Sequence, residues 1–342
     1  MRQAPWRTLI SSVHPNPTGK INYGATFLVT DQACSVPLEA GGRGLYAADT
    51  RFVSRHELRI NGKRPESVAS VRLSYRHARW HLIADDVAGA AGDMRGARVA
   101  VTVDRLLSSN RLHEDLVLHT YGRTPLTLLL EVALESDFAD LFEVRFKQWQ
   151  RRADLNTTWL GPNRLEASYR RDDFVRRCVV RTLTDKAGVS YANGSLRFPV
   201  ELIPGQDWRV CLQYDLLISD GVLPDVATRC EFELEGQDEP QLQARSWQSS
   251  VTRVKPADVR LEFAYERAIE DLAALRLHEL GDTSEHWMPA AGLPWFMALF
   301  GRDSLIASMQ AIMADPSVAN GTLASLARWQ ADHDHPVRTR PP

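Results

Sequence analysis

The sequence has few cysteines and no paired cysteine motif. Cys34, Cys178, Cys211 and Cys230 are the only four among 342 residues, and no C-x-x-C spacing occurs. This pattern does not support a disulfide scaffold, a zinc ribbon or a thioredoxin-type redox site. Cys178 and Cys211 lie in strand-like runs, which favours reduced, buried cysteines that behave as small apolar residues. We expect no metal site, because the acids and histidines of residues 332–335 stand in a tail without converging geometry.

Long apolar runs and an excess of charge of one sign are also absent. No run of 18 apolar residues occurs, and the N-terminal segment offers only Leu9-Ile10, which is too short for a signal sequence. Lys plus Arg number 41 against 43 for Asp plus Glu, so nothing attracts the chain to nucleic acid or to an anionic membrane. The sequence therefore predicts a cytoplasmic protein that binds neither nucleic acid nor membrane.

The first two thirds of the chain have the pattern of an antiparallel β protein. Short apolar or alternating runs, separated by turn residues, continue from residue 21 to about residue 234, without helical crossovers long enough for a parallel sheet. Asn61-Gly62 and Asn193-Gly194 predict type I′ hairpin turns. We expect a β-sandwich. The runs that best predict strands are residues 25–30, 57–60, 98–103, 126–134, 174–183, 195–202 and 208–218.

The periodicity changes to that of helices near residue 255. Apolar residues at three- and four-residue steps predict an amphipathic helix that ends at Gly281, and further helices are expected at about 304–314 and 323–331. We therefore expect a β-sandwich domain over residues 1–235, a polar linker over 236–256 and a helical segment over 257–342. The apolar stripes require a larger core than three helices enclose, so this segment is expected to be an incomplete helical domain that exposes apolar surface.

Three acids follow one another at three-residue steps in the middle of the chain. Asp137, Asp140 and Glu143 would lie close together on one helical turn, and paired carboxylates can perform acid–base catalysis. The simpler interpretation is an ion-pair cluster beside Arg145, which we favour because no nucleophilic or sugar-stacking group accompanies the acids.

The segment with the most chemistry is the aromatic loop that leads into the second predicted helix. Trp295 and Phe300 precede Arg302 and Asp303 at the start of this helix. A neutral sugar can pack its CH face on an aromatic ring while a carboxylate accepts from its hydroxyls and a guanidinium donates to them. The alternative is that Asp303 caps the helix with Arg302 as its partner. The spacing alone does not distinguish a sugar clamp from a cap.

Four segments of the chain carry a family resemblance. They are residues 44–65 (GLYAADTRFVSRHELRINGKRP), 111–118 (RLHEDLVL), 136–145 (SDFADLFEVR) and 290–310 (AAGLPWFMALFGRDSLIASMQ). With them the chain resembles, over nearly its whole length, the bacterial and archaeal glycogen-debranching-like proteins of the amylo-α-1,6-glucosidase type. The resemblance implies an N-terminal β-sandwich domain followed by an (α/α)6-barrel glycosidase domain.

The resemblance also implies a substrate site and a reaction. Gly301-Arg302-Asp303-Ser304 is similar to the R-D-S segment of glucoamylase-like barrels, which hold a terminal glucose beside an aromatic residue, so Trp295, Phe300, Arg302 and Asp303 are expected to bind substrate. Family members hydrolyse α-glucosidic bonds at α-1,6 branch points with inversion, using two carboxyl groups and no cofactor. The implied substrate is an α-glucan or an oligosaccharide.

The chain departs from the family in the length of its helical segment. A complete barrel needs about twelve helices and hence several hundred residues, and the family's two catalytic carboxylates lie in parts that this chain lacks. We therefore assign no catalytic residue and expect the N-terminal portion of a debranching-type glycosidase that is inactive alone, with a separately encoded remainder of the barrel as a partner. The alternatives are a non-catalytic glucan- or partner-binding module, or a fragment of another (α/α)6 α-glucosidase or a trehalase-like enzyme.

Overall fold

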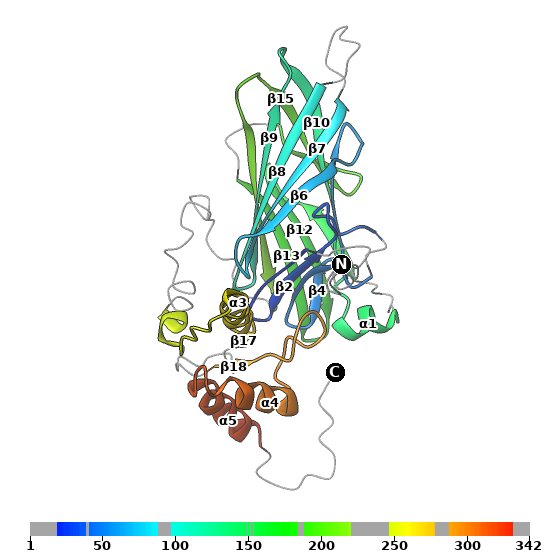
Figure 1. The fold of residues 1–342 in the computed structure, drawn as a ribbon. Coiled ribbons are helices and arrows are strands. Elements are labelled where there is room, and N and C mark those ends of the chain that lie inside the picture. Colours follow the sequence, from blue (N-terminus) through cyan, green and yellow to red (C-terminus); the bar gives the residue numbers. More distant parts are fainter. Residues whose placement is uncertain are drawn as a thin grey trace, which may run out of the picture. The chain divides into compact units, whose positions relative to one another are not determined.

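A computed structural model shows a chain that divides into two compact units, Met1–Glu235 and Gly236–Pro342 (Figure 1). The residues that the structure describes are 19–38, 41–87, 97–148, 150, 152, 154–183, 188–219, 246–277 and 287–330. The architecture is an antiparallel β-sandwich followed by a few helices, as the sequence predicts.

The described residues of the first unit form three antiparallel sheets. One sheet has the order β1 (Gly19–Tyr23), β2 (Thr26–Thr30), β3 (Gly44–Ala47) and β4 (Thr50–Val53). A second has the order β14 (Ser190–Ala192), β15 (Ser195–Leu202), β10 (Leu126–Glu135) and β5 (Arg55–Ile60). The third has eight strands in the order β11 (Leu155–Trp159), β12 (Arg164–Arg171), β13 (Phe174–Leu183), β16 (Trp208–Leu217), β9 (Arg111–Thr120), β8 (Ala97–Ser108), β7 (His77–Val87) and β6 (Glu66–Arg72).

The three sheets share one apolar core. On β10, Leu128, Leu130 and Val132 are buried at alternating positions, because successive side chains of a strand point to opposite faces. Across the core, Phe198 of β15 meets Trp208 of β16 edge to face, with ring centroids 6.2 Å apart. Every run that the sequence singled out as a strand lies largely within an observed strand.

The two Asn-Gly turns have different outcomes. Asn193-Gly194 joins β14 to β15 with both φ values positive, so this hairpin prediction is confirmed. Asn61-Gly62 also has two positive φ values and forms a tight turn in which Ile60 bridges Lys63. It makes no hairpin, however, because β5 pairs with β10 while the next strand, β6, pairs with β7 in the eight-stranded sheet. The geometry of the turn follows from the local sequence, whereas the sheet that each flanking strand joins depends on the tertiary structure.

A buried charged network connects two of the sheets. Glu114 of β9 accepts from Arg105 Nε of β8 at 2.7 Å and lies 2.9 Å from His56 Nε2 of β5, and the hydroxyl of Tyr214 donates to it at 2.8 Å. Arg105 also donates to the carbonyl of Cys34 at 2.6 Å. Burial alone would raise the pKa of Glu114, but Arg105 and His56 outweigh it and hold this pKa well below its usual range. The carboxylate is therefore ionised inside the core.

The second unit is smaller and largely helical. A helical turn at 246–250 is followed by α3 (Val259–Ala274), a two-stranded sheet of β17 (Arg276–Leu277) and β18 (Met288–Pro289), α4 (Gly301–Ala311) and α5 (Ser317–Trp329). Figure 1 shows α4 and α5 lying side by side, and a hydrogen bond of 2.7 Å joins Ser308 of α4 to Thr322 of α5. Gly321 of α5 leaves room for the backbone of Trp287, whose carbonyl oxygen would lie only 2.1 Å from an added Cβ.

Several boundaries in this unit differ from the sequence prediction. α4 covers Gly301–Ala311 instead of about 304–314, and α5 begins at Ser317 instead of about residue 323. The first helix was expected to end at Gly281, which lies outside the described residues, but α3 ends at Ala274 because the chain then enters β17. Part of the segment expected as a linker over 236–256 is packed in the structure. Trp247 of the helical turn is buried, packs edge to face on Trp287 at 5.3 Å and donates to Asp315 Oδ2 at 2.5 Å. Tertiary packing of one tryptophan thus gives structure to a polar segment.

The helices of the second unit expose many large apolar side chains. The apolar stripe of α3 was expected to run from Leu261, yet only its C-terminal end packs on the core, through Ile269 and Leu272. In the described part of this unit, the large apolar residues that are more than one third exposed are Val254, Val259, Leu261, Phe263, Leu305, Ile306, Met309, Ile312, Met313, Leu323 and Trp329. Soluble domains seldom expose so many neighbouring apolar groups unless another surface covers them.

Candidate functional site

The predicted substrate-binding residues lie on one loop and the first turn of the helix that follows it. The loop closes on itself, since the backbone amides of Gly292 and Phe296 donate to each other's carbonyls at 3.0 and 2.8 Å. Trp295 stands within this closed turn and is partly exposed. Phe300, also partly exposed, directly precedes α4 and packs its ring edge to face on Phe296 at 5.1 Å.

The start of α4 is fixed by its serines, which leaves Arg302 and Asp303 facing outward. Ser304 is fully buried and donates to the carbonyl of Pro289 at 2.8 Å. The side chains of Arg302 and Asp303 remain 84% and 44% exposed. The structure therefore places all four predicted residues at one loop–helix junction and leaves both charged groups accessible to a ligand.

The capping alternative for Asp303 does not agree with the structure. The N-cap of α4 is Phe300, no side chain forms a cap hydrogen bond, and Asp303 stands inside the first turn. Arg302 Nε lies 3.7 Å from Asp303 Oδ2, which is too long for a hydrogen bond. A carboxylate in the first turn still interacts favourably with the helix dipole. Neither group is committed to a neighbour by a short contact at this junction.

The three acids near residue 140 do not gather on a single helical turn. Asp137 precedes the helix and pairs with Arg51 of β4. Asp140 is the N-cap of α1 (Leu141–Phe146) and forms a capping box with Glu143, whose carboxylate also accepts from Arg152 at 2.7 Å. The expectation of one helical turn is wrong, because a left-handed residue at position 138 interrupts the helical path. These acids serve as a cap and as ion-pair partners in the structure.

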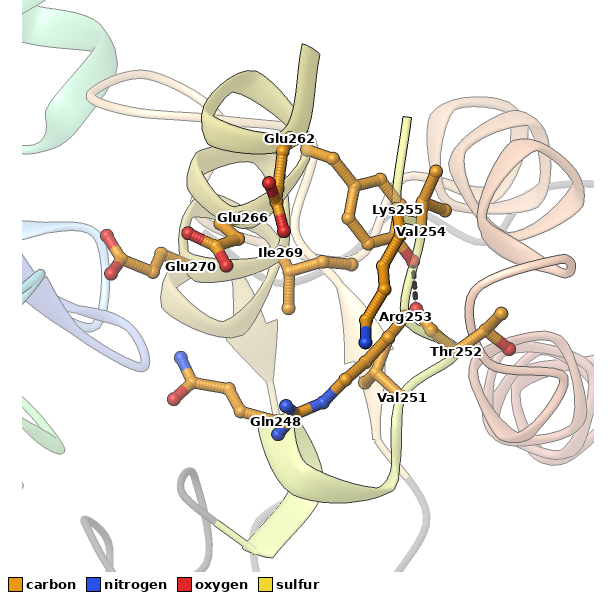
Figure 2. Close-up of a pocket in the computed structure, with 11 residues that line it drawn as sticks. Gln248, Val251, Thr252, Arg253, Val254, Lys255, Glu262, Glu266, Ile269 and Glu270 are labelled. Atoms are coloured by element: carbon orange, nitrogen blue, oxygen red, sulfur yellow. Dashed lines mark hydrogen bonds between the residues drawn. The ribbon is translucent and has the colours of Figure 1, made fainter. Parts of the chain in front are cut away.

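A pocket that the sequence did not indicate lies in the second unit (Figure 2). It encloses about 290 Å³ between residues 248–255 and one side of α3. Glu262, Glu266 and Glu270 line it at four-residue steps along α3, and Arg253 and Lys255 belong to the facing extended segment (Figure 2). The pocket is an open groove with exposed walls, and four-residue spacing of polar residues along a helix is too common to mark such a groove from sequence.

The sequence also missed a group of buried polar residues on the eight-stranded sheet. His113, Asp115 and Cys211 bring their side-chain ligand atoms within 4.8 Å of one another. The short pattern His-x-Asp inside a strand was a possible signal for two of them, because it places both on one face. Cys211 lies far away in the sequence and reaches them only through strand pairing.

The comparison with protein families gives one match, over residues 21–213, to the N-terminal domain of (some) glycogen debranching enzymes. The matched region is more than half of the chain and covers most of the β-sandwich. No curated protein matches the chain. None of the helices in the described part of the chain is long and apolar enough to cross a lipid bilayer.

Several solved structures are similar to the chain at low identity. A putative kojibiose phosphorylase from the human microbiome is 9% identical with a TM-score of 0.38, and the match covers 75% of this chain and 36% of that one. A GalM/aldose epimerase homologue from C. elegans is 12% identical with a TM-score of 0.31, over 60% of this chain and all of the other. This chain thus spans little more than a third of the phosphorylase. Similarities at this level do not bear on activity.

Proposed function

Because the chain belongs to the family of N-terminal domains of glycogen debranching enzymes, we propose that it is the N-terminal portion of an α-1,6-glucosidase and is inactive by itself. The reaction of the whole enzyme is hydrolysis of α-1,6 branch points in an α-glucan with inversion, in which one carboxyl group protonates the leaving oxygen and another activates water. The family match over residues 21–213 is the observation that carries the proposal.

The geometry at the start of α4 supports a sugar-binding role for Trp295, Phe300, Arg302 and Asp303 within the complete enzyme. Two exposed charged groups next to partly exposed aromatic rings can hold one edge of a glucose ring. Enclosing the ring requires further walls, because an exposed clamp competes with water for each hydrogen bond. The exposed apolar faces of α3 and α4 are consistent with a remainder of the barrel that packs there.

We also propose that the protein is cytoplasmic and that it has two kinds of partner. None of the three cysteines in the described residues is in a disulfide, which agrees with a reducing cytoplasm. The partners are an α-glucan and the remainder of the barrel domain.

The first experiment assays the full chain for glucose release from a branched dextrin and from isomaltose-type substrates. We expect no release above the blank, because the inverting pair of carboxyl groups is supplied by the rest of the enzyme. Turnover that disappears in Asp140→Asn or Glu143→Gln would overturn the proposal, since it would make the acidic segment at α1 a catalytic site.

The second experiment tests the clamp in a chimera that adds the missing barrel helices of a related debranching enzyme. Asp303→Asn should leave folding intact and lower kcat/KM by about 10- to 100-fold, because charge-assisted hydrogen bonds contribute about 1.5 to 3 kcal/mol each. Asp258→Asn is the matched control, since Asp258 also begins a helix of this unit, as the N-cap of α3. Equal kinetics for the two variants would remove the substrate-binding role from Asp303. Glucan binding without hydrolysis by the chimera would instead support a non-catalytic binding module.

A further inference from the structure

The polar group on the eight-stranded sheet lies on the face opposite the core. On β9, Leu112, Glu114 and Leu116 point into the sandwich. His113 and Asp115 alternate with them and therefore point to the other face. Cys211 of β16 is the direct register partner of Asp115, so it shares that face. β9 and β16 are neighbours near the middle of the sheet, where both strands are held by pairing on each side.

The three side chains lie close together, with their ligand atoms within 4.8 Å of one another. Cys211 Sγ lies 3.0 Å from His113 Nε2, and Asp115 Oδ1 lies 3.6 Å from the same nitrogen. All three residues are buried, with exposed fractions of 0% for His113, 6% for Asp115 and 7% for Cys211. A tetrahedral Zn²⁺ with bonds of about 2.0 to 2.3 Å places its ligand atoms about 3.3 to 3.6 Å apart. The two distances to His113 Nε2 lie near this range, and all three ligand atoms lie within 4.8 Å of one another.

The arrangement differs from that of a cysteine–histidine–aspartate nucleophile. In such a triad the acid holds one ring nitrogen of the histidine while the nucleophile contacts the other. Here both the sulfur and the carboxylate approach His113 Nε2. An imidazole, a carboxylate and a thiolate are donor types that bind Zn²⁺.

Ion pairs surround the cluster on this face of the sheet: Asp104 accepts from Arg79 Nε at 2.8 Å, and Asp215 accepts from Arg111 Nε at 2.7 Å and lies 3.4 Å from Arg181 Nη2. A metal-bound cysteine is a thiolate, so Cys211 and Asp115 together would contribute two negative charges. A divalent cation neutralises both, which offsets the cost of burying them. A thiolate ligand selects zinc or a similarly soft ion over magnesium or calcium.

We propose that His113, Asp115 and Cys211 bind a Zn²⁺ ion. His113 supplies an imidazole nitrogen, Asp115 a carboxylate oxygen and Cys211 a thiolate, and a water molecule completes the tetrahedron. The ion fastens β9 to β16 in the middle of the eight-stranded sheet, so its contribution is to the stability of the sandwich. This site could not be expected from the sequence, because the cysteine joins the His-x-Asp pair only across the sheet.

Co²⁺ substitution of the full chain tests the site with a signal that depends on the thiolate. After removal of bound metal with a chelator, one equivalent of Co²⁺ should produce thiolate-to-metal charge-transfer absorption together with the visible bands of a tetrahedral site. Cys211→Ser should abolish the charge-transfer band and weaken Zn²⁺ affinity at least 100-fold, since a loss of about 100-fold already follows from disturbing a second-shell partner. The matched control is Cys178→Ser, a buried cysteine on the core face of the same sheet.

Two results would overturn the proposal. One is that the metal-free wild-type chain binds no stoichiometric Zn²⁺, and the other is that Cys211→Ser keeps the charge-transfer band while Cys178→Ser or Cys230→Ser loses it. If Cys211→Ser does not fold, X-ray absorption at the zinc edge of the wild-type protein decides. We expect one sulfur and three nitrogen or oxygen neighbours, and a shell without sulfur would refute the site.

Discussion

The buried charge of Glu114 offers a quantitative test of what holds the sandwich together. Glu114→Gln keeps the size and most hydrogen-bonding capacity of the side chain but removes its charge. Arg105, whose side chain is 1% exposed, would then be a buried cation without the carboxylate that it contacts at 2.7 Å. Leaving one partner of a buried ion pair uncompensated costs about 3 to 5 kcal/mol. Since whole domains are stable by only about 5 to 15 kcal/mol, this loss is large.

Urea unfolding at neutral pH, followed by circular dichroism, measures this loss. Asp85→Asn is the matched control, because Asp85 pairs with Arg98 at 2.6 Å while both side chains are at least half exposed. Exposed pairs contribute about 0 to 1 kcal/mol, so the control should unfold almost like the wild type. A loss below about 1 kcal/mol for Glu114→Gln, or one equal to that of the control, would refute the reasoning.

A second substitution tests the physical cause. If the loss comes from the uncompensated guanidinium, adding Arg105→Met to Glu114→Gln should recover part of it, because the buried charge is then gone. Recovery should remain partial, since Arg105 also donates to the carbonyl of Cys34 at 2.6 Å. If Arg105→Met lowers the stability of Glu114→Gln by as much as it lowers that of the wild type, the pair does not act through its charge.

The same structure makes four further predictions. The pKa of Glu114 is lowered in the folded state, so the stability that its carboxylate contributes is present above the unfolded pKa near 4.5 and is lost as pH falls. The free energy of unfolding should therefore fall less steeply with acid in Glu114→Gln than in the wild type, and parallel curves would argue against the assignment. Gly321→Ala should destabilise the second unit by at least about 1 to 3 kcal/mol in thermal unfolding, because its new Cβ would clash with the backbone of Trp287. Gly301→Ala should not, because its new Cβ would lie 3.6 Å from a leucine methyl, and similar losses in the two variants would contradict the packing argument. Burial raises the pKa of Cys34 and Cys178 to about 12, so iodoacetamide at about pH 8 should leave both unmodified in the native chain, and fast alkylation would show that the core opens. Hydrogen exchange should be faster in the second unit than in the sandwich, and equal protection in a monodisperse monomer would count against an incomplete helical domain.

The candidate sugar site was visible in the sequence to a limited extent. The apolar period predicts a helix from about residue 304, and α4 begins three residues earlier, at Gly301. Whether Asp303 caps that helix depends on backbone angles and on the neighbouring loop, which local sequence does not specify. The structure assigns the N-cap position to Phe300 and leaves the carboxylate partly exposed. The residues of the candidate site could thus be named from the sequence, but the exposure of their side chains could not.

The sequence by itself indicated that the first part of the chain is built of strands and the second of helices, because alternation and the helical period are local properties of the chain. It also determined the geometry of both Asn-Gly turns. Only the tertiary structure decided that the turn after Ile60 separates two sheets and that Cys211 lies opposite Asp115. Alternation places His113 and Glu114 on opposite faces of β9, but it does not say which face becomes the core. That choice depends on pairing between strands far apart in sequence, and their register is set by burial of the whole sheet.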